Sequence, residues 1–338
     1  MARQEETKTM QVQMIQLNKK YFLLFLLLSF TSYNRTEGQT IKRTNIVMGS
    51  TIEILVRGTA NENANLAINA AFAESKRLDT LFSTFIKDNN MWRINNSEEE
   101  HIIVDSETFF MLTKCDELWR LTEGAFDAAI GKIIDLVGFE KKSPSMPTPQ
   151  EILVALKNVG WKKIELRKPN ILVKPKDVKI SFNAIVPGYA ADKCSRILEQ
   201  SGIQNYMVNV GGEIFAKGKE WKIGIQHPRK KNELLGTIVI DEYGVSTSGD
   251  YQQYFMKNGK RFTHIFNPVT GYPANECEAV TIIAKDALTA DALSTGIFVL
   301  GPKKGLALIE KLTDVEGIII DTTGTIHESS GFRKYLKR

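Results

Sequence analysis

The 338-residue sequence has few cysteines, no long apolar run and no strong excess of charge of either sign. Its three cysteines, Cys115, Cys194 and Cys277, are widely spaced, which excludes a disulfide-stabilised scaffold and a thiolate zinc cluster. No apolar run reaches about eighteen residues, which excludes a multispan membrane protein. The 44 Lys and Arg residues are interspersed with 39 Asp and Glu residues, so we expect no nucleic-acid partner.

Several common enzyme motifs are also absent. The sequence has no G-x-G-x-x-G fingerprint, no Walker motif, no nucleophile-elbow serine and no H-E-x-x-H motif, which excludes a Rossmann-type dinucleotide site. What is present is an ordinary globular balance of 43% hydrophobic and 25% charged residues. This length and composition allow one large domain or two modest ones.

The N-terminus has the layout of an export signal. The run Tyr21–Phe30 is apolar and uncharged, follows Lys19 and Lys20 directly, and is too short to span a bilayer. Because the polar stretch 31–40 is typical of a tether, we interpret residues 1–40 as an export signal or N-terminal anchor plus tether. A buried core helix is the alternative interpretation.

Two details of this segment stay open. Translation from Met14 would give a more conventional signal with a short basic start. The sequence does not settle whether the signal is cleaved or retained as an anchor, but it has no cysteine before Cys115, which excludes a lipid-anchored cysteine. We therefore expect an exported protein that is periplasmic or attached through its N-terminus to the outer face of the inner membrane.

Apolar periodicity predicts a mixture of helices and strands in the rest of the chain. The expected helices are Asn65–Phe85, a helix capped by Ser106, Ala190–Gln200 and Ala287–Val299, and Ser143–Pro149 is expected to be a loop or the start of an insertion. The expected strands are Thr44–Val56 around Gly49, Tyr206–Val210, Trp221–Ile225, Thr237–Ile240, Ala279–Ile283 and Gly317–Ile320. Because strands cluster instead of alternating with helices, we predict an α+β fold, with one domain over residues 41–338, a largely antiparallel sheet and room for two lobes.

Asp291 and Thr295 form the first local candidate for a functional site. They lie four residues apart in an expected helix and therefore share one face. A carboxylate and a hydroxyl are hard oxygen donors, which suit Mg²⁺ or Ca²⁺ better than zinc. Taken alone, the pair is more typical of a solvated helix face.

Three further segments carry residue types that suit a ligand site. Thr247–Tyr251 combines hydroxyls with a glycine, although a turn between strands is the simpler interpretation. His264 precedes a Pro-x-Thr-Gly turn, where it could act as a general base or bind a phosphate oxygen, although a structural histidine is the simpler interpretation. Gly211-Gly212 after a strand, and Gly188-Tyr189 before a helix, are typical of close backbone approach to a cofactor.

Seven segments follow one another along the chain: LDTLFSTF, TEGAFDAAIG, SFNAIVPGYAADK, NVGGEIFAKG, STSGDY, THIFNPVTGYP and ADALSTGIFVLG. Together with the strand at Met48, they resemble the FAD:protein FMN transferase family, the ApbE-type flavin transferases. The resemblance covers roughly residues 44 to 325. The resemblance implies an α+β fold, FAD as substrate, Mg²⁺ as cofactor and an exported or membrane-attached location.

The resemblance also implies an activity and a partner. The FMN half of FAD would pass to a Ser or Thr hydroxyl of an acceptor protein through a phosphoester bond, and AMP would leave. The diphosphate is anionic, so a metal ion would offset its charge. The acceptor would expose its Ser or Thr in a loop, and in this family such acceptors are typically membrane redox subunits.

The resemblance assigns roles to particular residues. It implies metal ligation by Asp291, Thr295 and the Ala184 carbonyl. Its implied FAD contacts are Met48, Phe85, Ala125, Phe126, Asp127, Ser181, Pro187, Gly211, Gly212, Thr247, Ser248, Gly249 and Phe266. His264 is our candidate for activating the acceptor hydroxyl, with Asp250 as its assistant.

Three positions depart from the family pattern. Pro187 stands where relatives often have Lys or Glu, and Ser181 stands where Asp is common, which affects contacts to the adenine or ribose. Ser294 stands where some relatives add another aspartate near the metal, so its carboxylate is missing here.

Two other functions fit the same residues. A metal-dependent FAD pyrophosphatase would use water in place of the acceptor hydroxyl and release free FMN and AMP. A non-catalytic FAD-binding protein would not need the metal ligands, so Asp291 and Thr295 argue against it. The products of the reaction separate the first alternative from the transferase.

Overall fold

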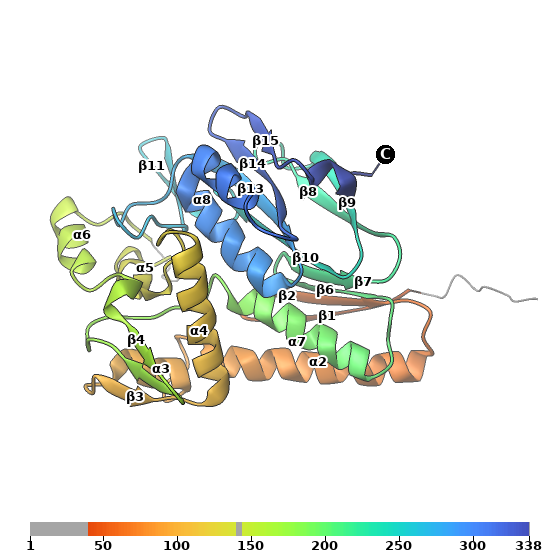
Figure 1. The fold of residues 1–338 in the computed structure, drawn as a ribbon, viewed down its shortest axis with the longest axis horizontal. Helices are drawn as coiled ribbons and strands as arrows, with labels where there is room; N and C mark the ends of the chain where they lie inside the picture. Colours follow the sequence, from red (N-terminus) through yellow and green to blue (C-terminus); the bar gives the residue numbers. More distant parts are fainter. Residues whose placement is uncertain (1–39, 140–143, 338) are drawn as a thin grey trace, which may run out of the picture. The chain divides into compact units, whose positions relative to one another are not determined.

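An eight-stranded sheet with helices on one face forms the centre of the protein (Figure 1). The computed structural model describes residues 40–139 and 144–337, so the predicted export signal lies outside the described residues. The sheet order is β1-β2-β6-β7-β10-β13-β14-β15, and every neighbouring pair is antiparallel. Its strands are β1 (Ile41–Val47), β2 (Ser50–Val56), β6 (Tyr206–Val210), β7 (Glu213–Lys217), β10 (Tyr243–Gly249), β13 (Cys277–Ala284), β14 (Glu316–Asp321) and β15 (Ile326–Glu328).

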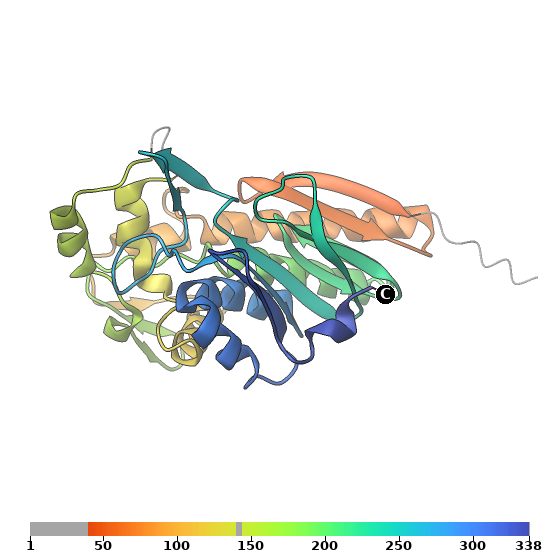
Figure 2. The same ribbon diagram turned by 90° about the horizontal axis from the view of Figure 1, so that it is seen from above.

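Three long helices cover one face of this sheet. They are α2 (Asn61–Phe82), α7 (Val186–Gln200) and α8 (Ala287–Ile309). In α2 the buried side chains recur every three to four residues, from Ala64 to Phe82, so a single apolar stripe faces the core. Figure 2 shows α2 alongside the β1–β2 hairpin.

The opposite face is covered by a separate hairpin, β8 (Trp221–Gln226) and β9 (Leu234–Ile240). Strand β8 alternates buried and exposed residues, and Trp221, Ile223 and Ile225 pack in one apolar cluster with residues of β7, β10, β13 and β14. Because β13 lies between the helices and this hairpin, all eight of its residues are buried. The sheet is therefore the middle of three layers.

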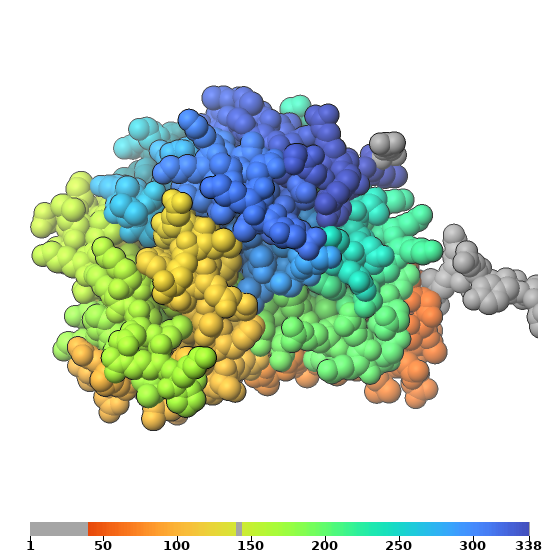
Figure 3. Space-filling model, in the orientation of Figure 1, coloured from red at the N-terminus to blue at the C-terminus, as the bar shows by residue number. Residues whose placement is uncertain are grey.

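Smaller elements flank these layers at one end. They are α3 (Asn90–Asn96), β3 (His101–Ile103), α4 (Ser106–Leu121), α5 (Gly131–Val137), α6 (Pro149–Leu156), β4 (Glu165–Arg167), β5 (Ile171–Val173) and the hairpin β11 (Tyr254–Lys257) with β12 (Lys260–Thr263). Helix α4 borders α8 on the surface (Figure 3), and a methyl group on Gly296 of α8 would lie 2.8 Å from the Thr122 side chain at the end of α4. From Thr40 onward, the described residues cluster as one compact unit.

The predicted fold class is confirmed, and several predicted boundaries need correction. Residues 44–56 form two strands and not one, because Met48 and Gly49 make a two-residue turn between Val47 and Ser50. The cap of α4 is Asp105, whose carboxylate accepts hydrogen bonds from the N–H groups of Glu107 and Thr108. The expected loop around Ser143–Pro149 ends in the start of α6, with Pro149 at the first turn and a capping box from Thr148.

The two helices nearest the site also differ from their predicted ranges. Helix α7 begins at Val186 and not at Ala190, and it carries Pro187 in its first turn, where proline is tolerated. Helix α8 continues to Ile309, beyond the predicted end at Val299, across a kink at Gly301 and Pro302.

Candidate active site

A cavity of about 640 Å³ opens where the ends of α2, α7, α8 and several sheet strands meet. All of the predicted site residues line it except Asp250, Gly212 and Gly249. The predicted residues on its wall are Met48, Phe85, Ala125, Phe126, Asp127, Ser181, Ala184, Pro187, Gly211, Thr247, Ser248, His264, Phe266, Asp291 and Thr295. Segments separated by more than two hundred residues in the sequence therefore share one pocket.

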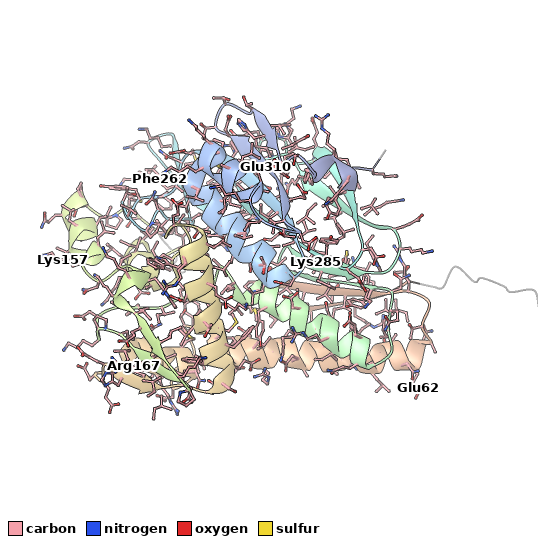
Figure 4. All side chains as sticks on the ribbon, viewed as in Figure 1. Glu62, Lys157, Arg167, Phe262, Lys285 and Glu310 are labelled. Carbon is pink, nitrogen blue, oxygen red and sulfur yellow. The ribbon has the colours of Figure 1, made fainter. Side chains whose placement is uncertain are left out.

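Helices α7 and α8 hold each other in place beside this cavity. The Gly188 N–H near the start of α7 donates to Asp291 Oδ2 at 3.0 Å, and Asp192 of α7 accepts from the Ala287 and Leu288 N–H groups at 2.8 and 3.0 Å. Each helix thus supplies a carboxylate to the other's N-terminal turn, where the helix dipole favours negative charge. Figure 4 labels Lys285, which lies just before α8.

Gly188 is required for this contact. A Cβ at this position would lie 2.3 Å from the Ala287 carbonyl oxygen and 2.8 Å from the Asp291 Cβ, so only glycine allows the helices to approach this closely. The Gly188 N–H donates to Asp291 and not to the carbonyl of Ala184, the residue four positions earlier in the chain. Ala184 lines the cavity. The predicted metal ligands Ala184, Asp291 and Thr295 are therefore brought to one wall.

A chain of hydroxyl groups links β10 to α8 behind this wall. Ser248 Oγ lies 3.2 Å from Thr295 Oγ1 and 2.8 Å from Ser294 Oγ. Ser246 Oγ lies 3.3 Å from Ser294 Oγ and 3.4 Å from Glu213 Oε1. The chain therefore runs from Thr295 on the cavity wall to a carboxylate on β7.

Glu213 is the functional candidate that the sequence analysis missed. It follows the Gly211-Gly212 turn and lines the cavity. Burial raises the pKa of Asp291 well above its ordinary value, and the negative charge of Glu213 raises it further. Burial also raises the pKa of Glu213 itself, to about 7. Within residues 40–139 and 144–337, neither carboxylate forms an ion pair with Lys, Arg or His. The acidic residue is visible in the sequence at the end of the NVGGE segment. Nothing in the sequence, however, indicates that Glu213 lies near Asp291, 78 residues further along the chain.

The donor set suits a hard divalent cation. Two acidic side chains, the Thr295 hydroxyl and the backbone at Ala184 supply only oxygen atoms, which Mg²⁺ prefers. The described residues contain no group of three or more His, Cys, Asp or Glu side chains able to hold a metal, so a cation here would need hydroxyl, carbonyl or substrate oxygens as well. Ser294 is fully buried, does not line the cavity and donates to the Asp291 carbonyl at 2.8 Å, so it is not among the donors on this wall.

His264 lies on the wall with one ring nitrogen already committed. Its Nδ1 is 3.1 Å from the carbonyl oxygen of Gln253. A carbonyl can only accept, so Nδ1 carries the proton and, in the neutral ring, Nε2 keeps its lone pair. Burial lowers the pKa of His264 from its ordinary value, which favours this neutral form. The arrangement suits a general base.

Aromatic side chains form the apolar part of the wall. Phe139 lies 5.9 Å from Phe266 and 6.2 Å from the His264 ring, both in edge-to-face geometry. Phe126 is buried, whereas Phe85 is 65% exposed and free to contact a ligand. A flat heterocycle would find both rigid and adjustable aromatic contacts here.

Two hairpin turns lie next to each other at one edge of the cavity. Met48 and Gly49 have φ values of 53° and 69°, and Gly211 and Gly212 have 72° and 123°. Strands β2 and β6 pair, and the Gly211 N–H donates to the Thr51 carbonyl, so the two turns are adjacent. Met48 holds the left-handed conformation without being glycine, which is strain at a cavity-lining residue.

Asp127 and Ser181 are held by local hydrogen bonds. Asp127 accepts from the N–H groups of Ala129 and Trp161 at 2.8 and 2.9 Å, and burial nevertheless raises its pKa to about 6. The Ser181 N–H donates to the Ala128 carbonyl at 2.8 Å. These bonds fix two neighbouring loops of the cavity wall.

The structure gives the three remaining predicted residues other surroundings. Asp250 accepts from both Nη atoms of Arg229, at 2.7 and 2.8 Å, and from Arg261 Nη1 at 3.0 Å, so its carboxylate is committed to two guanidinium groups. A Cβ on Gly249 would lie 2.5 Å from the Tyr251 ring, so this glycine serves packing. Gly212 completes the β6–β7 turn, where its N–H bonds Asn209.

Comparison with known proteins decides the family. The model of the ApbE family matches residues 48–319. The chain belongs to the ApbE family. It is 33% identical over 318 residues to the FAD:protein FMN transferase of Haemophilus influenzae, covering 88% of this chain and 92% of the relative. It is 32% identical to the protein of the same name from Escherichia coli K12, covering 69% of this chain and 70% of the relative.

Solved structures of the family agree with the fold. The crystal structure of the ApbE protein from Thermotoga maritima matches with a TM-score of 0.83 at 31% identity, covering 89% of this chain and all of that one. The flavin transferase ApbE from Vibrio cholerae matches with a TM-score of 0.79 at 28% identity, covering 88% of this chain and all of that one. The predicted family is thereby confirmed.

Proposed function

We propose that this protein is an FAD:protein FMN transferase, which moves the FMN part of FAD onto a Ser or Thr hydroxyl of an acceptor protein and releases AMP. The observation that carries the proposal is the single cavity in which the oxygen cluster of Asp291, Thr295 and Glu213 faces the same space as His264 and the aromatic wall. The names of the relatives support the same activity.

His264 accepts the proton in the proposed reaction. The acceptor hydroxyl oxygen attacks the FMN phosphorus and forms a new P–O bond, while its proton passes to His264 Nε2. The P–O bond to the AMP half breaks, and AMP leaves with the bonding electron pair. The Gln253 carbonyl supports this role because it fixes the ring tautomer that leaves Nε2 unprotonated.

Mg²⁺ is the proposed cofactor. Asp291, Thr295 and the Ala184 carbonyl would hold it, and Glu213 supplies the second carboxylate that Ser294 does not. When bound, the ion would offset the charge of the FAD diphosphate. Asp250 has a positioning role in this proposal, because its ion pairs with Arg229 and Arg261 tie the end of β10 to the β8–β9 loop and to β12.

The proposed acceptor and location rest on sequence features. The run Tyr21–Phe30 after two lysines supports export and membrane attachment through the N-terminus. A periplasmic or membrane-attached enzyme would meet membrane redox subunits, and we propose one with an exposed Ser or Thr loop as the acceptor.

Mass spectrometry of the reaction products tests the proposed function. The purified protein is incubated with FAD, Mg²⁺ and a candidate acceptor domain, with a parallel reaction that lacks the acceptor. We expect one FMN on an acceptor Ser or Thr and an equal amount of AMP, both dependent on Mg²⁺. Free FMN and AMP at the same rate without acceptor would instead establish the pyrophosphatase, and intact bound FAD in both reactions would indicate a binding protein.

A further inference from the structure

The hairpin β11–β12 stands at the mouth of the cavity. Gln252 and Gln253 line the cavity just before β11, and His264 lines it just after β12. Among the described residues these two strands pair only with each other. Figure 2 shows the hairpin projecting from the rest of the fold, and Figure 4 labels Phe262 on it.

One face of the hairpin continues the aromatic wall of the cavity. Phe139 on that wall lies 5.5 Å from Phe255, which stacks on its cross-strand partner Phe262 at 5.2 Å with an interplanar angle of 8°. Side chains alternate along a strand, so the next pair on this face is Lys257 with Lys260. The cavity is therefore extended outward by an aromatic strip that ends in two lysines.

These two lysines form an unfavourable arrangement in the isolated protein. They are directly opposite each other across the strands, where like charges are destabilising. Both are exposed, and neither forms an ion pair within the described part of the chain. The turn between them, Asn258-Gly259, has φ values of 51° and 73°, which suit a tight two-residue hairpin turn and hold the lysines together.

The third cation of the hairpin is already neutralised. Arg261 donates to Asp250 at 3.0 Å and lies 4.4 Å from the Tyr254 ring centre, on the other face. The unbalanced charge is thus confined to Lys257 and Lys260. An acidic segment lying along the aromatic strip would neutralise both lysines and cover Phe255 and Phe262.

We propose that the aromatic and lysine-bearing face of β11–β12 docks the acceptor protein, by binding an acidic segment that flanks its Ser or Thr. This inference rests on the proposed transferase function. Lys260 is three residues from Thr263 at the base of the hairpin, about 10 Å away. An acceptor whose hydroxyl reaches His264 would therefore place Asp or Glu about three residues away opposite the lysine pair.

Charge reversal tests this docking surface. The full-length protein and its Lys257→Glu/Lys260→Glu variant are compared, with two synthetic peptides as acceptors. Both peptides carry one central Thr, flanked by Asp in one and by Lys in the other. We expect the wild-type protein to prefer the Asp peptide, and the variant to have a KM for it about tenfold higher. The kcat and the affinity for FAD, followed by flavin fluorescence, should stay within twofold of wild type.

A second charge reversal is the matched control. Lys303→Glu/Lys304→Glu changes two exposed lysines of α8 that do not line the cavity, and it should leave the KM unchanged. An equal KM for the Asp peptide in wild type and hairpin variant would overturn the docking proposal while leaving the transferase intact. Transfer to neither peptide nor any acceptor domain by wild type would contradict the proposed function itself. Loss of binding to anionic lipid vesicles in the hairpin variant, at unchanged peptide KM, would assign the lysines to a membrane and refute acceptor docking.

Discussion

The contact between α7 and α8 predicts the effect of a single added methyl group. In Gly188→Ala the new Cβ would lie 2.3 Å from the Ala287 carbonyl oxygen, so the helices must separate. Overpacking of this kind costs about 1–3 kcal/mol. The hydrogen bond from Gly188 to Asp291 lengthens at the same time, which costs about 1–2 kcal/mol more. We expect a loss of about 3 kcal/mol, which lowers Tm by about 5 °C for a domain of about 300 residues.

The same change should weaken cation binding, since Asp291 moves with α8. Thermal unfolding followed by circular dichroism gives the stability, and titration with Mn²⁺ followed by electron paramagnetic resonance gives the affinity. Gly236→Ala is the matched control, because its Cβ would lie 3.4 Å from the nearest atom, an ordinary contact, and its stability should change by less than about 0.5 kcal/mol. A Gly188→Ala protein with wild-type Tm and wild-type Mn²⁺ affinity would refute this account of the helix contact.

Four further predictions concern single side chains in the cavity or near it. His264→Ala should slow transfer by about 10²–10⁴-fold at unchanged FAD affinity. Because burial lowers the pKa of His264, the rate of the wild-type protein should fall with acid only below the ordinary histidine pKa of about 6.5. A pH–rate profile with its acid midpoint above that value would contradict the assignment. Glu213→Gln should weaken Mn²⁺ binding. Because the folded-state pKa of Glu213 is raised from 4.5 to about 7, its ionisation costs stability as the pH rises through that window, so the variant should stabilise the metal-free protein at pH 8 and not at pH 4.5. Equal stability of both proteins at pH 8 would count against the buried carboxylate pair. Met48→Asn should relieve the left-handed backbone strain and raise the free energy of unfolding in urea by about 1 kcal/mol. It should also weaken FAD binding, because Met48 lines the cavity. Unchanged FAD affinity would show that the Met48 side chain does not contact FAD. Asp250→Asn should leave the pH dependence of the transfer rate unchanged. A shift of the acid side of that pH profile would show instead that Asp250 is a catalytic group.

Much of the fold could be predicted because its signals are local. The apolar stripe of α2 and the alternation in β8 follow directly from burial on one face. The turn at Met48 could not be predicted, because methionine rarely takes the left-handed conformation and the sequence reads as one continuous strand. The sequence predicts the start of α7 four residues too late, since Pro187 and Gly188 are weak helix signals whose positions depend on α8.

The site was predictable by residue type and order, but not by its long-range contacts. Asp291 and Thr295 share one helix face, so their pairing was visible in the sequence. The hydroxyl chain from Thr295 to Glu213 joins residues on α8, β10 and β7. No spacing in the sequence predicts these contacts. The commitment of Asp250 to Arg229 likewise depends on how the β8–β9 hairpin packs on the sheet.

A crystal structure of the protein grown with FAD and Mn²⁺ tests the central claim most directly, since the anomalous signal locates the cation without assumptions. We expect the flavin against Phe139 and Phe266, and the diphosphate between His264 and the cation. The Mn²⁺ peak should lie within coordination distance of the Asp291 carboxylate and the Thr295 hydroxyl. FAD bound elsewhere, or a cation that contacts neither residue, would contradict the account.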